Sequence, residues 1–230
     1  MKKKSKKKRK FTKFFRKVLV LLFFILIIFL FGTLIYYLFE DNIHNIYING
    51  NKYISDQEIL ELAKLDTYPG FFTTISPKIE KNIEKNPLIK KANVHKKLFY
   101  KIEIDIEENE PLFYRLDNGK LVLDNGNEIN YIEDDTIPIL INYVPDKKYK
   151  SFIEKFSKID DEVRKKISEI EYTPTEYDED RFLLYMNDKN YVYVTLTKLN
   201  VLNKYNDTIT KLEGKRGTLY LDSGNYFEFD

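Results

Sequence analysis

The side chains that most often act as nucleophiles, general bases and metal ligands are nearly absent from this chain. It has two histidines, His44 and His95, and no cysteine among 230 residues. A His-activated nucleophile or a Cys/His zinc site needs several such side chains together. Ser55 and Ser76 stand where a serine would cap a helix. We therefore expect no catalytic residue, no metal site and no cofactor.

Carboxylates are the remaining groups capable of chemistry. They gather in three clusters: Glu107-Glu108-Asn109-Glu110, Glu133-Asp134-Asp135 and Asp178-Glu179-Asp180. We interpret them as solvated loops or strand faces. Weak calcium binding stays open as an alternative, although the EF-hand spacing is missing. A glycosidase-type carboxylate pair also stays open.

An apolar segment joins two parts of opposite charge. Residues 1–17 hold 11 of the 38 Lys and Arg and no acid, whereas residues 40–230 hold the other 27 and all 36 Asp and Glu. Residues 18–39 carry no charge, and a bilayer-spanning helix needs about 20 residues. The positive-inside rule then places residues 1–17 in the cytoplasm and the chain after residue 40 outside the membrane. A cleaved signal peptide is the alternative, but its apolar region is typically shorter.

The basic tail, residues 1–17, has a simple interpretation. Positive charge beside a membrane span sets topology and contacts anionic lipid. Nucleic-acid binding would need a fold that reads bases, and the sequence shows none. We expect lipid contact at the tail and no nucleic-acid partner.

After a connector at residues 40–45, residues 46–111 predict a small domain in the order β-α-α-β-β. A short strand at residues 46–49 runs into the turn Gly50-Asn51. Ser55 and Glu58 form a capping box for the first helix. The second helix is expected to have Ser76 as its cap and Pro77 at its first position.

Two strands complete this domain. Residues 89–98 form a basic strand with a few apolar positions. Residues 101–107 alternate strictly between isoleucine and charged residues, which is typical of a strand with one buried face.

Residues 112–230 predict a second domain that begins with short hairpins. The turns are Asp117-Asn118-Gly119 and Asp124-Asn125-Gly126. Helices are expected near residues 147–158 and 160–167, and a longer one through residues 197–212, where leucines recur at helical spacing. Strands are expected within residues 167–174, 181–196 and 217–230.

The order of these motifs resembles the FtsQ/DivIB family of bacterial division proteins. The family's POTRA (polypeptide-transport-associated) domain has a strand ending in Gly-Asn, a helix opening Ser-x-x-Glu-Ile and a second helix ending Asn-Pro-x-Ile. The matching residues here are Gly50-Asn51, Ser55 to Ile59 and Asn86 to Ile89. Later matches are Val94 to Lys97, Glu107 to Pro111, the segment LVLDNGNEI and the segment Leu221 to Gly224. The loop Tyr68-Pro69-Gly70-Phe71-Phe72 departs from the family pattern.

The resemblance implies an α+β fold: a single transmembrane helix at residues 18–39, a POTRA domain at residues 46–111, and a mixed β-domain with flanking helices at residues 112–230. It also implies a non-catalytic scaffold at the division septum. The implied partners are DivIC/FtsB-like and FtsL-like membrane proteins and, through them, the septal peptidoglycan synthase complex. An exposed strand edge can accept a strand from another chain, and the last hairpin is the expected receiving surface. The expected partner-binding residues are Thr218, Leu219, Tyr220, Leu221, Asp222, Ser223, Tyr226 and Phe227.

Three alternatives remain. The last hairpin could simply close its own core. The chain could be a membrane-anchored cell-wall enzyme, or a POTRA-type component of protein transport.

Overall fold

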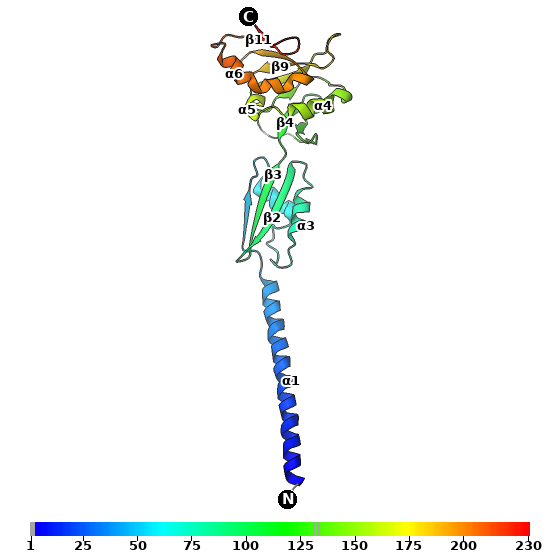
Figure 1. Ribbon diagram of the computed structural model, residues 1–230, viewed down its shortest axis with the longest axis vertical. Coiled ribbons are helices and arrows are strands. Elements are labelled where there is room, and N and C mark those ends of the chain that lie inside the picture. Colours follow the sequence, from blue (N-terminus) through cyan, green and yellow to red (C-terminus); the bar gives the residue numbers. More distant parts are fainter. Residues whose placement is uncertain (1–2, 131, 133) are drawn as a thin grey trace. The chain divides into compact units, whose positions relative to one another are not determined.

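A computed structural model describes residues 3–130, 132 and 134–230 (Figure 1). Glu133 of the second acidic cluster and the first two residues of the basic tail lie outside the described residues. The chain begins with helix α1 (Lys3–Glu40). Within it, Lys13–Tyr37 is long and apolar enough to cross a membrane, with a mean hydropathy of 3.3 and no buried residues. The apolar segment predicted from the sequence is therefore present as a helix.

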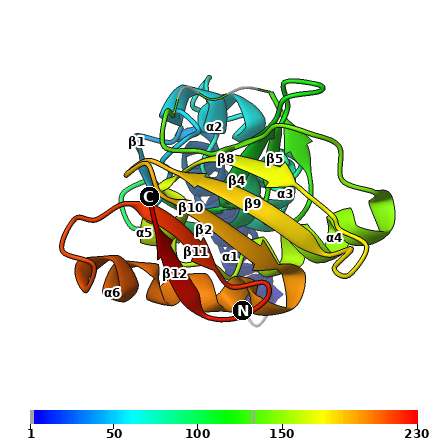
Figure 2. The same ribbon diagram turned by 90° about the horizontal axis from the view of Figure 1, so that it is seen from above.

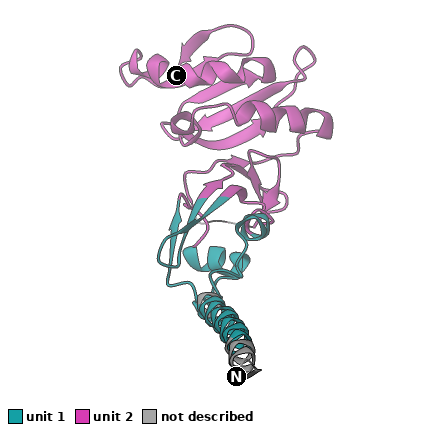
Figure 3. Ribbon diagram, turned by 60° about the horizontal axis from the view of Figure 1, so that its bottom comes forward, with its two compact units in different colours: residues 1–49, 56–82, 93–105 teal, residues 50–55, 83–92, 106–230 magenta. Residues whose placement is uncertain are grey.

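The chain divides into two compact units, which Figure 3 shows in different colours. The first unit contains residues 1–49, 56–82 and 93–105, and the second contains residues 50–55, 83–92 and 106–230. The change from one β-sheet to the next falls between Glu108 and Pro111. The domain limits expected at residues 111 and 112 stay a prediction.

A three-stranded sheet in the order β1-β3-β2 follows α1. Its elements are β1 (Asn45–Asn49), α2 (Asp56–Ala63), α3 (Ser76–Ile83), β2 (Ile89–Lys97) and β3 (Lys101–Glu108). The expected β-α-α-β-β order is confirmed. The start of α3 differs slightly from the expectation, because the carbonyl of Ile75 accepts the first helical hydrogen bonds, from Lys78 and Ile79. Ser76 is thus the first helical residue and not the cap.

Strand β3 has the two faces that its alternation predicts. Ile102, Ile104 and Ile106 are buried. On the other face, Glu103 pairs with Lys97 and Asp105 lies 3.9 Å from His95. Strand β1 runs parallel to β3, with Ile46 opposite Ile102 and Ile48 opposite Ile104. These exposed ion pairs contribute little to stability, so the isoleucine face holds the sheet.

One carboxylate organises the turn after β1. The Glu108 side chain accepts hydrogen bonds from the backbone N–H groups of Lys52, Tyr53 and Ile54, at 2.9–3.0 Å. Charge-assisted bonds of this kind are stronger than neutral ones. At Gly50 the backbone has φ +85°, and an added Cβ would lie 2.2 Å from the Ile106 carbonyl oxygen. Only glycine fits this position.

A nine-stranded sheet occupies the second unit, in the order β12-β11-β10-β9-β8-β7-β4-β5-β6. The strands are β4 (Pro111–Arg115), β5 (Leu121–Leu123), β6 (Glu128–Ile129), β7 (Ile139–Leu140), β8 (Ile167–Tyr172), β9 (Arg181–Met186), β10 (Tyr191–Thr195), β11 (Gly217–Tyr220) and β12 (Tyr226–Phe229). Both predicted hairpins are present, because β5 pairs antiparallel with β4 and with β6. Strand pairs β4–β7, β7–β8 and β10–β11 are parallel. The sheet is mixed, and the predicted α+β class is confirmed.

Helices of this unit pack against one face of the sheet. They are α4 (Asp146–Phe156), α5 (Asp161–Arg164), the 3₁₀-helix η1 (Leu196–Lys204) and α6 (Tyr205–Thr210). Phe152 and Phe156 of α4 are fully buried in a core that also contains Phe182 of β9. Figure 2 shows strands β8 to β12 side by side, with α4 and α6 beside them. The helical layer therefore decides which strand residues are buried.

The predicted single helix through residues 197–212 is wrong in type. The chain there forms nine residues of 3₁₀-helix and then the short α6. Leu196, Leu199, Leu202 and Tyr205 are buried and recur every three residues. That spacing fits a 3₁₀-helix, in which residues three apart lie directly above one another. The spacing of so few apolar residues in the sequence did not distinguish an α-helix from a 3₁₀-helix.

The glycine at residue 50 provides a test of this fold. Gly50→Ala should lower the free energy of unfolding by more than about 3 kcal/mol, because the new methyl group collides with backbone that cannot move aside. Gly119→Ala is the matched control. It has a similar φ of +66° but nothing within 4 Å of the added Cβ, so only left-handed strain of about 1 kcal/mol is expected. Urea denaturation of the detergent-solubilised chain measures both, and equal losses would contradict the close approach at Gly50.

Candidate functional site

Strand β12 forms one edge of the nine-stranded sheet in the described part of the chain. It pairs antiparallel with β11, with Thr218 opposite Glu228 and Tyr220 opposite Tyr226. The Asp230 N–H donates to the Arg216 carbonyl. Because antiparallel residues alternate between bonded and non-bonded pairs, Glu228 and Tyr226 also direct their backbone groups toward β11. The N–H and C=O groups of Phe227 and Phe229 then point away from the sheet, as a template for another strand.

Gly217 allows β12 to lie this close to β11. An added Cβ at residue 217 would lie 1.9 Å from the Glu228 carbonyl oxygen. The Gly217 N–H donates to the Asn190 side chain at 3.0 Å, a buried hydrogen bond. Any larger residue would push β12 away, so the position of the edge depends on this glycine.

The structure divides the eight expected partner-binding residues between two faces. Leu219 and Leu221 belong to the buried core, and Phe227 packs against that core. Thr218 and Tyr220 alternate with Leu219 along β11 and share the opposite face with Tyr226. Asp222 and Ser223 form the turn that follows. Leu219 and Leu221 match the interpretation that the hairpin closes its own core, whereas the outward set stays a prediction for partner binding.

Tyrosines cover the outward face of the last strands. Tyr220 stacks on Tyr193 of β10 and on Tyr226 of β12, with ring centroids 5.4 and 4.7 Å apart. Tyr191 contacts Tyr185 edge-to-face at 5.6 Å. The outward tyrosine face, defined here as Tyr185, Tyr191, Tyr193, Tyr220 and Tyr226, therefore crosses four neighbouring strands.

Three of these tyrosines were missed from the sequence. Tyr191 and Tyr193 alternate with the buried Val192 and Val194 in YVYVT, so their outward position was readable. Tyr185 lies in a continuous apolar run in RFLLYM, where Leu183 on the same face is also buried, so its outward position was not. Their position next to Tyr220 could not be predicted from the sequence, because it depends on the parallel pairing of β10 with β11.

A charged pair lies beside this face. Arg181 Nε donates to Asp222 Oδ2 at 2.7 Å, and both side chains are at most 19% exposed. The Arg181 guanidinium also lies 3.7 Å from the centre of the Tyr193 ring, a cation–π contact. Burial acts to raise the pKa of Asp222, but the hydrogen bonds from Arg181 and Ser223 outweigh it, so this pKa lies below its usual range. The pair holds the turn after β11 against the sheet.

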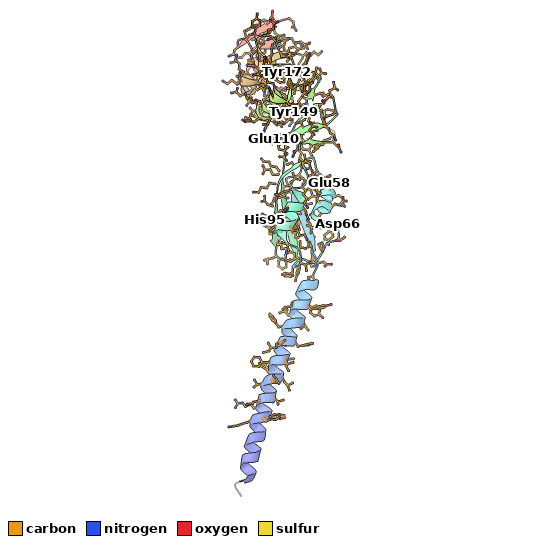
Figure 4. All side chains as sticks on the ribbon, turned by 90° about the vertical axis from the view of Figure 1, so that its right-hand side faces the viewer. Glu58, Asp66, His95, Glu110, Tyr149 and Tyr172 are labelled. Atoms are coloured by element: carbon orange, nitrogen blue, oxygen red, sulfur yellow. The ribbon has the colours of Figure 1, made fainter. Side chains whose placement is uncertain are left out.

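The histidines and the buried tyrosine hydroxyls are further groups with acid–base chemistry in the described part of the chain. Among the described residues, no group of three His, Asp or Glu side chains could hold a metal ion. His95 (labelled in Figure 4) lies on β2 with a half-exposed side chain, and His44 lies in the connector. Burial, partly offset by Arg115, raises the pKa of Tyr149 to about 12, so that hydroxyl stays protonated at neutral pH.

The acidic clusters serve structural roles at several positions. Glu108 binds the turn at residues 52–54. Asp134 accepts hydrogen bonds from Thr136, and Asp180 accepts one from Lys148 at 2.6 Å. Glu110 pairs with the buried Arg164. These contacts give four of the carboxylates in the clusters a structural role, and calcium binding stays an open alternative.

The lowered pKa of Asp222 predicts a pH-dependent stability. A carboxylate with a folded pKa below its unfolded value of about 3.9 stabilises the fold above that pH, and the effect is lost as the pH falls through the folded pKa. Asp222→Asn should therefore cost about 2 kcal/mol at pH 7 and less at pH 2. Urea denaturation at both pH values measures this. The exposed Asp207→Asn is the control, and a pH-independent cost at residue 222 would contradict the ion pair.

Comparisons with known proteins agree with this architecture. A family model described as POTRA domain, FtsQ-type, matches residues 42–109. The cell division protein DivIB of Bacillus subtilis is 34% identical over 219 residues, which cover 90% of this chain and 82% of that protein. DivIB of Bacillus anthracis is 29% identical over 98% of this chain and 87% of its own length.

A solved structure was also found. It is the major extracytoplasmic domain of DivIB from Geobacillus stearothermophilus, in its trans isomer. It aligns with 46% of this chain at 24% identity, with a TM-score of 0.39, and the alignment covers 96% of that structure. The identity to the Bacillus subtilis protein over most of both chains carries the assignment: the chain belongs to the DivIB family of bacterial cell division proteins.

Proposed function

We propose that this division protein is a non-catalytic scaffold that binds a DivIC/FtsB-like membrane protein at the β12 edge, assembles with an FtsL-like protein, and so helps control septal peptidoglycan synthesis. The open backbone of β12 is the observation that carries the proposal. Family membership supports the division role. The partners are an inference from the resemblance and from the chemistry of the edge.

Strand addition is the mode of binding that the edge favours. The backbone groups of Phe227 and Phe229 can form hydrogen bonds with an extended segment, and such bonds supply affinity in strand addition. Side-chain contacts then supply specificity. Tyr226, 51% exposed, and its stacked neighbour Tyr220 present rings beside the added strand. Tyrosines give large contact area at low entropy cost, as at other interfaces.

The topology proposed with this function follows from the charge pattern. Residues 1–17 would lie in the cytoplasm against anionic lipid, α1 would span the membrane, and the POTRA and β-domains would lie outside, at the septum. A tether of this kind raises the effective concentration of other membrane proteins. Modest affinity at the β12 edge would then suffice.

Two other functions can be tested against this one. A cell-wall enzyme would release fragments from purified wall, and a transport component would bind exported chains. Incubation of the protein with purified wall is the direct test of the first.

Substitution at Phe229 tests strand addition. Phe229→Pro removes an outward N–H and blocks an incoming strand, yet proline is tolerated on edge strands. It should raise the Kd for the organism's DivIC-like protein by about 5- to 10-fold, since one lost backbone hydrogen bond costs roughly 1 kcal/mol and 1.4 kcal/mol is tenfold. A fluorescence titration with the full chains in detergent measures the Kd.

Phe229→Ala is the matched control. It removes the same ring, which contacts Phe227 at 5.2 Å, but keeps the backbone N–H. Its effect on Kd should be clearly smaller. Equal weakening by both substitutions would mean that the side chain, and not the backbone edge, makes the contact.

Control of septal synthesis is tested in cells. Depletion of the protein should reduce the incorporation of a fluorescent D-amino acid at septa. The wild-type chain should restore it, and Phe229→Pro should restore less than Phe229→Ala. Normal incorporation of the fluorescent D-amino acid at septa after depletion would contradict a role in septal peptidoglycan synthesis.

A further inference from the structure

The turn between β2 and β3 exposes two large apolar side chains. Leu98 is 81% exposed and Phe99 is 76% exposed. Both lie in the loop at residues 98–100, in the first compact unit. Isolated exposed apolar residues are common on protein surfaces, so the exposure of these two side chains does not by itself indicate a binding site.

The backbone of the turn provides that evidence. Phe99 and Tyr100 have φ values of +63° and +57°. Two consecutive positive φ values are the pattern of a type I′ hairpin turn, for which Asn-Gly is strongly preferred. Aromatic residues in this region cost about 1–3 kcal/mol each in strain. The turn thus departs from both the local backbone preference and the preference for polar groups in water, as functional sites do.

The turn belongs to a larger aromatic patch. The Tyr100 ring lies 5.5 Å from Phe71 and 6.1 Å from Phe72, and those two rings are 5.3 Å apart. Phe72 is 44% exposed. The aromatic turn patch is defined here as Phe71, Phe72, Leu98, Phe99 and Tyr100. It joins the β2–β3 turn to the loop in which this sequence departs from the family pattern.

Hydrogen bonds hold this patch to the connector that follows α1. The Phe71 N–H donates to the Asp41 carbonyl at 2.9 Å, and the His44 N–H donates to the Tyr100 carbonyl at 2.8 Å. Asp41 is four residues beyond Tyr37, where the apolar span ends. A helix rises 1.5 Å per residue, so Asp41 is about 6 Å along the axis from that end. The two hydrogen bonds and the short connection therefore hold the patch close in the chain to the end of the apolar span.

Three lysines lie in or next to the segments that carry the aromatic turn patch. Lys96 lies 4.8 Å from the centre of the Phe71 ring and donates to the Phe71 carbonyl at 2.5 Å. Lys97 and Lys101 flank the turn on either side. Lys97 also pairs with Glu103. Aromatic rings beside lysines are the combination that membrane interfaces favour, since the rings enter the headgroup layer and the amines meet lipid phosphates.

We propose that the aromatic turn patch docks on the phospholipid bilayer, with Leu98 and Phe99 entering the headgroup layer of the leaflet from which α1 emerges. The occupant is lipid, and its anionic headgroups meet the flanking lysines. The docking would restrict the orientation of the domain next to the membrane. The inference requires α1 to span the bilayer, but it does not depend on the partner proposed at the β12 edge.

The absence of native tryptophan makes the test direct. The full chain carrying Phe99→Trp is reconstituted into nanodiscs of phosphatidylcholine and phosphatidylglycerol, with and without lipids brominated in their acyl chains. Bromine quenches tryptophan only at short range. We expect a blue-shifted emission and quenching at least about twofold greater than for Tyr177→Trp, since Tyr177 is 98% exposed and lies in the loop before β9.

Two further variants make each outcome decisive. Tyr37→Trp, at the end of the span, should be quenched whether or not the patch docks. Leu98→Glu added to Phe99→Trp should remove the quenching, and it disturbs no core because Leu98 is exposed. Quenching at Tyr37→Trp but not at Phe99→Trp would overturn the lipid docking. Quenching at neither position would overturn the inference together with the predicted span.

Discussion

The contact between Phe152 and Phe182 joins the helical layer of the second unit to its sheet. Their rings are stacked 4.6 Å apart, and Phe113 lies 5.3 Å from Phe152. Once α4 covers this face, the two-residue period of β9, β10 and β11 forces the alternate side chains to the other face. Those side chains include the tyrosines of the outward face. The position of the candidate binding surface thus follows from burial on the opposite side, because one sheet cannot present the same residues to its core and to a partner.

An open edge strand is usually a liability, and proteins protect such edges or use them. Here the edge is short, and Gly217 brings it close to β11. The ion pair of Arg181 and Asp222 stabilises the adjoining turn. A rigid, pre-formed edge loses little entropy when a second strand is added. Such an edge would suit the membrane-tethered scaffold proposed above, because tethering raises the effective concentration of membrane partners.

The part of the first unit that comes after α1 poses a different physical problem, because it is joined directly to an apolar helix. Its connector is hydrogen-bonded to two loops that carry exposed aromatic side chains. Exposure of these apolar side chains to water is unfavourable, whereas their insertion into the headgroup layer would be favourable. The lipid docking proposed above would also account for the lysines next to these rings. The backbone strain at Phe99 and Tyr100 would then be offset by the function of the surface that these residues form.

The sequence by itself determined the apolar span, the charge asymmetry, the β-α-α-β-β order and the buried face of β3, because each depends on residues close together in the chain. It also carried the motif order that indicates the DivIB family. Only the tertiary structure decided that β12 lies at an edge, that Tyr193 stacks on Tyr220, and that Leu219 and Leu221 belong to the core. The reason is physical: strand neighbours are chosen by long-range packing and pairing, and a two-residue period leaves open which face is buried and which strand lies alongside.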